Sequence, residues 1–329
     1  MDRGRVVRTW TGSRSKRYAP RVAPATGKGR TVDITTWTAK AGTIPPGFPV
    51  ARALPARERR TVGPFCFLDH FGPFELGDEH GMQVGPHPHI GLQTVTWLFA
   101  GALVHRDSLG SVQRIEPGEL NLMTSGDVGV VHTERTPDDA PKRLHGVQMW
   151  TALPQGVMDA AFEHHASLPR RAEEGVETTV FLGQLEELRS PATLHTPGVG
   201  AELRLEAGAR ARFDVDPAHE FALFAVDGAV DGTFTLDGSN AMAHATPGSS
   251  ALEIGSPNGA HVILLGGAPF ETDAWAVDIA LAGVQKAMAL PPGLVLFTLS
   301  ERAARQAEAV PRRGFYTDVL RYRDKHRDH

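Results

Sequence analysis

The feature that most restricts the fold is a series of short, alternating apolar runs between Thr31 and Trp150, which Pro- and Gly-containing turns interrupt. The turn signals are PPG at 45–47, FGP at 71–73, EPGE at 116–119 and TSGD at 124–127. Short strands joined by such turns, without regular intervening helices, are typical of antiparallel barrels and sandwiches. We therefore predict an antiparallel β unit over residues 31–153.

A second strand-rich block follows, and we predict a second β unit over residues 178–270. Its expected strands lie within 201–215, within 220–236 and near 261–265. The segments LFAGALVHRDS at 98–108 and LFAVDGAVDGT at 223–233 each have the pattern of a strand, a glycine turn and a strand. This similarity indicates a diverged internal duplication, although strand-turn-strand segments resemble one another easily.

The other segments differ in composition and set the expected domain boundaries. Residues 1–30 hold nine Lys or Arg against one Asp, which is typical of a flexible, solvated lead-in. Residues 154–177, with the charged run RRAEEGVE, are predicted to be a linker that contains a short helix at Val157–His165. The end of the chain, residues 271–329, is predicted to be a partly helical extension with helices over 275–289 and 300–310.

Composition and charge exclude several classes of function. The 329 residues carry a formal net charge of −4, so we expect neither a direct nucleic-acid partner nor a membrane partner. The single cysteine, Cys66, rules out an internal disulfide and a thiolate-rich zinc site. No apolar run approaches the roughly 18 residues of a membrane span and the N-terminus has no apolar signal core, so we expect a cytoplasmic protein.

The stretch GPHPHIGLQTVTWLFAG at 85–101 places two histidines at the head of an apolar strand. Side chains of a strand alternate between its two faces, so one face is expected to carry His87, His89, Gln93, Val95, Trp97 and Phe99. The apolar members are expected to line a barrel interior. Residues two apart in a strand are separated by about 6.6 Å, and both imidazoles can then reach one ion with bonds of roughly 2.1 Å.

The stretch DVGVVHTER at 127–135 repeats this arrangement, because Val128, Val130, His132 and Glu134 share one face of a strand. Two such pairs on neighbouring strands predict a metal site of three histidines and one carboxylate, with open positions for substrate or dioxygen. A lone pair of this spacing is more often incidental. An amidohydrolase barrel also begins with HxH, but it requires alternating strands and helices.

The other histidines have no paired spacing. We expect surface or hydrogen-bonded structural roles for His70, His80, His105, His145, His164, His165 and His195. In the second block His219, His244 and His261 lie singly on separate segments, so we expect no metal there.

Three segments closely resemble the pirin family of bicupin proteins: FCFLDHFGP, HPHIGLQTVTWLFAGALVHRDSLGS and IEPGELNLMTSGDVGVVHTER. The likeness is dense over residues 60–150 and thinner over 178–268. It implies an all-β dominated fold of two cupin-type antiparallel β-barrels with a few short helices. It also implies one metal ion, usually iron, in the N-terminal cupin, at the positions that match the family's ligands, namely His87, His89, His132 and Glu134.

The chain departs from the family pattern at several points. The family commonly has Arg after HPH and Glu three residues further on, where this chain has Ile90 and Gln93. Because Gln93 shares the predicted inward phase, the missing carboxylate is expected to lower the negative charge near the ion. The C-terminal YGPFVMNT-like segment of the family is not visible after GGAPF, and residues 270–329 differ from it.

The resemblance implies two classes of function. Some pirins act as quercetin 2,3-dioxygenases, so the first hypothesis is a metal-dependent oxidoreductase that cleaves a flavonol-like aromatic substrate, with Glu134 as the candidate general base. Fe(II) is the favoured ion, with Mn, Co, Ni, Cu or Zn as alternatives for nitrogen and oxygen ligands. The alternative is a metal- or redox-responsive regulatory protein that acts through contacts with a protein partner.

Overall fold

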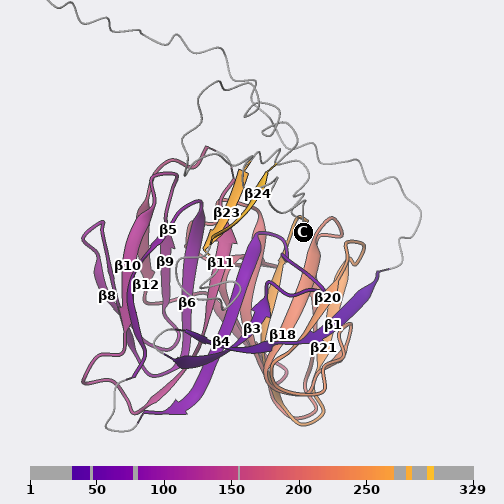
Figure 1. Cartoon of the computed structure of the whole chain (residues 1–329). Helices are drawn as coiled ribbons and strands as arrows, with labels where there is room; N and C mark the ends of the chain where they lie inside the picture. The colour runs from indigo at the N-terminus through magenta and orange to yellow at the C-terminus, as the bar shows by residue number, and fades with distance from the viewer. Residues whose placement is uncertain are drawn as a thin grey trace, which may run out of the picture.

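A computed structural model describes residues 32–44, 47–76, 81–154 and 156–269, together with the backbone of 279–283 and 295–299. Regular structure in these residues consists of strands alone, and every strand pair is antiparallel (Figure 1). The all-β class is therefore confirmed. In the same residues no helix has the length and apolar character needed to cross a membrane.

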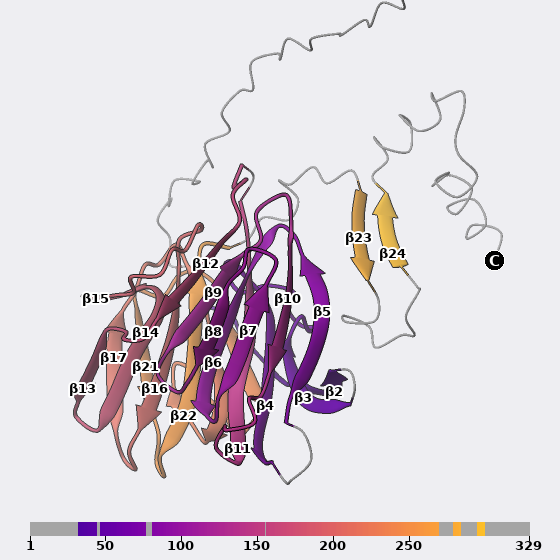
Figure 2. The same cartoon turned by 90° about the vertical axis from the view of Figure 1, so that its left-hand side faces the viewer.

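The N-terminal unit consists of two facing sheets (Figure 2). The seven-stranded sheet has the order β12-β9-β6-β11-β4-β3-β2. Its strands are β2 (Lys40–Ile44), β3 (Phe48–Leu54), β4 (Phe65–Glu75), β6 (Leu92–Ala100), β9 (Leu120–Thr124), β11 (Arg143–Ala152) and β12 (Ala161–His165). The four-stranded sheet has the order β5-β10-β7-β8 and contains β5 (Gln83–His89), β7 (Leu103–Asp107), β8 (Val112–Ile115) and β10 (Val130–Arg135).

The C-terminal unit repeats this arrangement. Its eight-stranded sheet has the order β1-β20-β18-β22-β16-β14-β13, with β15 paired to β14. These strands are β1 (Ile34–Thr38), β13 (Arg170–Glu173), β14 (Val176–Leu185), β15 (Leu188–Arg189), β16 (Gly198–Leu205), β18 (Glu220–Gly228), β20 (Ala241–Ala245) and β22 (Ala260–Gly267). The three-stranded sheet contains β17 (Arg210–Asp214), β19 (Asp231–Gly232) and β21 (Ala251–Gly255), and β23 (Ile279–Gly283) pairs separately with β24 (Val295–Leu299).

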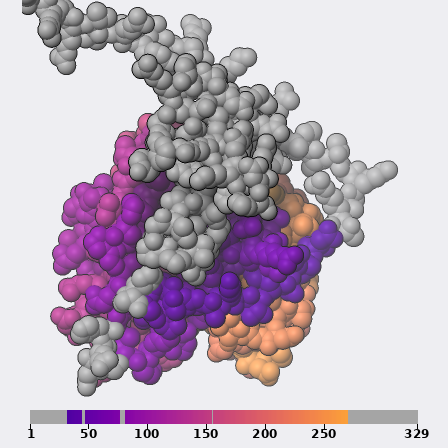
Figure 3. Space-filling view, in the orientation of Figure 1, coloured from indigo at the N-terminus to yellow at the C-terminus, as the bar shows by residue number. Residues whose placement is uncertain are grey.

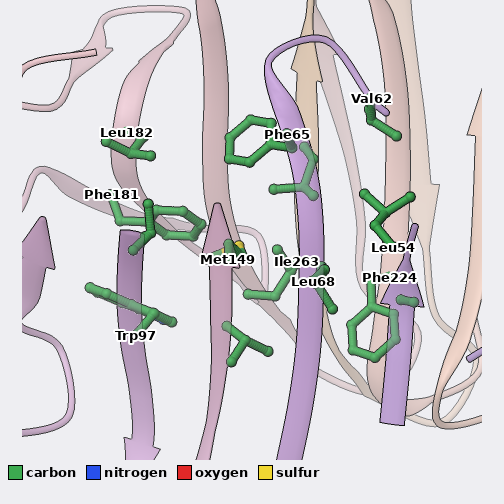
Figure 4. Packing of buried hydrophobic residues seen from close by; sticks show 14 of the residues in the cluster. Leu54, Val62, Phe65, Leu68, Trp97, Met149, Phe181, Leu182, Phe224 and Ile263 are labelled. Carbon is green, nitrogen blue, oxygen red and sulfur yellow. The ribbon is translucent and has the colours of Figure 1, made fainter. Parts of the chain in front are cut away.

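Three apolar cores lie between the layers of sheet. The core between the two large sheets joins Leu68, Trp97 and Met149 of the N-terminal unit to Phe181 and Phe224 of the C-terminal unit (Figure 4). The interior of each unit contains a separate core. Strands of the large sheets are therefore covered on both faces, which explains why most of β6 is buried and why β18 is largely an apolar run.

Equivalent glycine corners connect the large and small sheets of both units. Gly101 (φ +88°) links β6 to β7, and Gly228 (φ +80°) links β18 to β19. A Cβ at either position would lie 2.3 Å from a backbone carbonyl oxygen, which only glycine avoids. The two segments that indicated a duplication thus have the same place in their respective units.

Several predicted elements are wrong. The helix expected at Val157–His165 is replaced by β12, because Ala161–His165 pairs with β9 at the open edge of the large sheet. The helix expected over 275–289 is wrong at Ile279–Gly283, which is strand β23. The helix expected over 300–310 lies outside the described residues.

The turn expected at FGP is also wrong, because Gly72 and Pro73 lie within β4. One extra residue of β4 opposes β11 there, since Phe71 pairs with Gly146 and Phe74 with Leu144. The strand therefore continues through a bulge. The turns expected at 116–119 and 124–127 are confirmed between β8 and β9 and after β9.

Two connections link the units more closely than a single linker would. β1 precedes the strands of the N-terminal unit, yet it pairs with β20 of the C-terminal sheet. In the space-filling view the indigo segment that includes β1 to β3 extends across both units (Figure 3). Residues 154–177 contribute β12 to one large sheet and β13 to the other. The domain boundaries given above stay a prediction.

Candidate metal centre

The stretch that carries the first two histidines is divided into two strands. β5 ends at His89 and belongs to the four-stranded sheet, whereas β6 begins at Leu92 and belongs to the seven-stranded sheet. Gly91 between them has φ +70°, a left-handed conformation that favours glycine. The alternation of side chains therefore does not continue from β5 to β6, and the prediction of one shared face across residues 87–99 is wrong.

The odd-numbered residues of β6 face the C-terminal unit. The Trp97 ring stacks on Phe181 with centroids 5.2 Å apart, and its Nε1 donates to Glu202 Oε2 at 2.9 Å. Val95 belongs to the same core between the units. The expectation that Val95 and Trp97 line the barrel interior is thus wrong.

Gln93 also lies outside the candidate site. Its Nε2 donates to Thr124 Oγ1 and to the Thr193 carbonyl oxygen, both at 2.9 Å, and its Oε1 accepts from Thr151 Oγ1 at 3.1 Å. Its side chain is therefore held toward the C-terminal unit. The expected effect of Gln93 on the charge near an ion is wrong for this reason.

Three predicted ligands come together on β5 and β10. His132 lies directly opposite His87 in the antiparallel pairing, and Val130 lies opposite His89. The Nε2 atoms of His87 and His132 are 3.0 Å apart. One ring nitrogen from each of His87, His89 and His132 lies within 4.8 Å of the other two. Imidazole nitrogens that converge in this way can bind one divalent ion.

A backbone contact fixes the orientation of the His87 ring. Its Nδ1 lies 2.9 Å from the Gly85 carbonyl oxygen, which can only accept a hydrogen bond. Nδ1 therefore carries the proton, and the lone pair of Nε2 is directed toward His132. Metal-binding histidines commonly have this type of second hydrogen bond.

Glu134 reaches the same region through an irregularity between β5 and β10. His132 pairs with His87 but Glu134 pairs with Val84, so β5 has one extra residue. The Glu134 Oε1 accepts from Thr96 Oγ1 at 2.8 Å. One possible ligand atom from each of Glu134, His132 and His105 lies within 4.8 Å of the other two. His132 therefore belongs both to this set and to the set of three histidines. The prediction that Val128 lies on the inward face is wrong, because Val128 is 77% exposed and lies in the turn before β10.

His105 is the site residue that sequence reasoning missed. It lies on β7 opposite Glu134, is 3% exposed, and places its Nδ1 at 3.3 Å from His132 Nδ1. Its Nε2 lies 2.9 Å from Asp107 Oδ2. Because an ionised carboxylate only accepts, His105 is protonated at Nε2 and its Nδ1 accepts from His132. The spacing of His105 and Asp107, two apart on one strand face, was the available signal.

The charge of Asp107 supports this assignment. Burial raises the pKa of the Asp107 carboxyl, but hydrogen bonds from His105 and Ser111 outweigh burial, so its pKa is lowered overall. Asp107 is therefore ionised at neutral pH. The chain of contacts leaves His132 Nε2 without a proton and directed toward His87.

The three histidines line a cavity of about 320 Å³, in the size range of small-molecule sites. One wall is a stack of planar groups. The Arg52 guanidinium lies 4.8 Å from the Phe67 ring centroid, Phe67 stacks on Trp150 at 3.9 Å, and Trp150 meets His89 at 4.9 Å. Arg52 also binds Asp69 through two hydrogen bonds of 2.8 and 2.7 Å. Imidazole and carboxylate donors beside an aromatic wall fit a first-row divalent ion and a planar ligand.

The remaining histidines have other partners. His70 Nε2 lies 2.8 Å from His145 Nε2, His164 contacts Asn121, and His195 is exposed. His80 lies outside the described residues. Between the units, the buried His244 and Glu220 of the C-terminal unit contact each other, and Glu220 also binds the half-buried Arg59 of the N-terminal unit.

Comparison with known proteins gives a consistent assignment. The family model described as Pirin matches residues 47–151. A Pseudomonas aeruginosa protein with the provisional name quercetin 2,3-dioxygenase is 43% identical over 236 residues, 71% of this chain and 74% of that protein. A pirin-like protein of Caulobacter vibrioides is 37% identical over 236 residues, 68% of this chain and 79% of that protein. A crystal structure of quercetin 2,3-dioxygenase from Acinetobacter baumannii has a TM-score of 0.70 at 37% identity, covering 83% of this chain and 86% of that one. The chain therefore belongs to the pirin family.

Proposed function

We propose that this protein is a metal-dependent dioxygenase that cleaves a flavonol such as quercetin in the N-terminal cavity. The names of the Pseudomonas and Acinetobacter relatives support the reaction class. The observation that carries the proposal is the convergence of His87 and His132, with Nε2 atoms 3.0 Å apart, in the lining of a cavity that also has aromatic walls.

In this proposal His87, His89, His132 and Glu134 hold one divalent ion, and Fe(II) is our first choice. Mn, Co, Ni, Cu and Zn accept the same donors and are tested beside it. A bound redox-capable ion with open positions would supply the point at which a deprotonated hydroxyl and dioxygen meet.

The side chains of the cavity would bind and orient the substrate. The edges of Phe67 and Trp150 provide an apolar wall for a flat ring system, since each ring has a planar neighbour on its face. Glu134 is 6% exposed and is the candidate base for the substrate hydroxyl, with its Oε1 held by Thr96. The walls would exclude bulk water around this proton transfer.

The direct test is turnover with defined metals. Metal-free protein would be loaded without oxygen with Fe(II), Mn, Co, Ni, Cu or Zn, then mixed with quercetin and dioxygen. We expect loss of flavonol absorbance together with oxygen uptake for at least one ion, abolished in His132→Ala and retained in His195→Ala, which changes an exposed histidine. Absence of quercetin loss with every ion would contradict the proposal.

A regulatory protein is the second candidate, and one surface favours it. Ile90, Val128 and Met158 are 64%, 77% and 57% exposed; Val128 lies in the turn at 126–129, and Ile90 and Met158 lie beside its two glycines. A gathering of exposed apolar side chains is typical of a contact surface for another protein. This candidate would replace the enzyme if metal-loaded protein left quercetin and oxygen unchanged.

A further inference from the structure

Thr96 lies between two side chains that compete for its only proton. Its Oγ1 is 2.8 Å from Glu134 Oε1 and 3.0 Å from Gln148 Oε1. A hydroxyl has one proton, and an ionised carboxylate is a stronger acceptor than an amide oxygen. Thr96 therefore donates to Glu134. In that case Thr96 Oγ1 and Gln148 Oε1 face each other at 3.0 Å with no proton between them.

A half-turn of the Gln148 amide resolves this conflict, because its oxygen and nitrogen occupy nearly equivalent positions. With Nε2 beside Thr96, Gln148 donates to Thr96, and Thr96 donates to Glu134. The amide oxygen of Gln148 is then directed away from Thr96. Gln148 is half-buried and lines the cavity, so in this orientation its amide oxygen would be available to a ligand there.

The neighbouring wall of the cavity carries a second acceptor. Asp69 on β4 lies directly opposite Gln148 on β11 in the sheet register, and both line the cavity. Burial raises the pKa of the Asp69 carboxyl, and the ion pair with Arg52 offsets part of this effect. Arg52, which also lines the cavity, already donates to both Asp69 oxygens, whereas the turned amide oxygen of Gln148 would accept a hydrogen bond from a ligand hydroxyl group.

We propose that Gln148 is a specificity-determining residue that accepts a hydrogen bond from a phenolic hydroxyl of the substrate. The site would then select polyhydroxylated flavonols over flavonols without additional hydroxyl groups. This inference rests on the proposed function, because it concerns the ligand of the same cavity.

The test compares two ligands on metal-loaded protein in the absence of oxygen, so that binding is measured without turnover. The ligands are quercetin and 3-hydroxyflavone, which retains only the 3-hydroxyl group, and quenching of tryptophan fluorescence gives both Kd values. We expect wild-type protein to bind quercetin more tightly. In Gln148→Met the quercetin affinity should fall by roughly 2- to 12-fold, the equivalent of one hydrogen bond, while the 3-hydroxyflavone affinity stays unchanged. Gln184→Met, which changes an exposed glutamine on β14, should retain the preference.

Equal binding of the two ligands by wild-type protein would overturn the inference without any variant. Equal losses for both ligands in Gln148→Met, with metal content unchanged, would also overturn it. These outcomes are distinct from failure of the proposed function. If quercetin is turned over but both ligands bind equally, only the proposed role of Gln148 is contradicted. If quercetin binds more tightly but no ion supports turnover, only the proposed dioxygenase activity is contradicted.

Discussion

The Nδ1 atoms of His132 and His105 lie 3.3 Å apart, which makes His105 the direct partner of a candidate metal ligand. His105 is held in turn by Asp107, whose carboxylate is buried and ionised. Orientation of a ligating imidazole through its second nitrogen is a common property of metal sites. His132 on β10 and His105 and Asp107 on β7 therefore form one hydrogen-bonded chain that positions the metal ligand. Because the Asp107 carboxylate only accepts hydrogen bonds, it fixes which ring nitrogen of each histidine carries the proton.

Asp107→Asn should weaken metal binding by about 10- to 100-fold. Asp107 Oδ1 accepts from the backbone N–H groups of Leu109 and Ser111, so the amide oxygen of an asparagine would take that position. The amide nitrogen would then face His105 and reverse its tautomer, which forces the His132 proton onto Nε2. Chelator competition measures the affinity. Asp139→Asn, at an exposed position, is the control, and equal affinities in both variants would contradict the relay.

Gln93→Glu should leave metal affinity and the pH profile of any activity unchanged, but it should lower the free energy of unfolding by about 2 kcal/mol or more. The carboxylate would lose both donor contacts, to Thr124 and to the Thr193 carbonyl oxygen, in a buried position. Denaturant unfolding and metal titration measure the two effects. Gln184→Glu is the exposed control. A shifted pH profile of activity with an unchanged free energy of unfolding would contradict this prediction and indicate that residue 93 acts at the cavity.

The contrast at Gln93 shows how far the sequence predicts this site. Spacing of two residues correctly paired His87 with His89, since both lie on β5. Extension of that phase to Gln93 failed because Gly91 in a left-handed conformation ends the strand and β6 joins another sheet. The pattern of apolar residues in β6 does not show which face is turned toward the cavity, because both faces of this strand are buried.

Other errors had a similar origin in tertiary context. The spacing of His105 and Asp107 indicates a shared strand face, but it does not show that β10 brings His132 to His105, so the sequence alone predicts a surface or hydrogen-bonded structural role. The helical propensity around Val157–His165 was overridden because the open edge of β9 accepts another strand. The two-unit all-β organisation was predictable, since its turns and strand lengths are local properties.

The His145 substitution tests a pH dependence between the units. Burial, followed by the charges of His70 and His261, lowers the pKa of His145 from its ordinary 6.5 to about 4. The unfolded state therefore binds more protons in this interval, and His145 reduces stability as pH falls from 6.5 toward 4. Relative to His145→Gln, wild-type protein should lose unfolding free energy over this interval in denaturant titrations. A difference between wild-type protein and His145→Gln that does not change with pH would contradict the shift.

Gly101→Ala should destabilise the fold more than Gly110→Ala, although both glycines have positive φ. Gly101 has φ +88° and Gly110 has φ +94°, so both substitutions incur the left-handed cost of about 1–2 kcal/mol. A Cβ at Gly101 would additionally lie 2.3 Å from the Arg143 carbonyl oxygen, whereas a Cβ at Gly110 has no neighbour within 4 Å. The resulting backbone displacement should add about 1–3 kcal/mol. Unfolding free energies from denaturant titration measure the difference. Equal losses for the two variants would mean that the backbone between β6 and β7 accommodates the added Cβ without additional loss of stability. Since β7 carries His105, Gly101→Ala should also weaken metal binding, while Gly110→Ala should not.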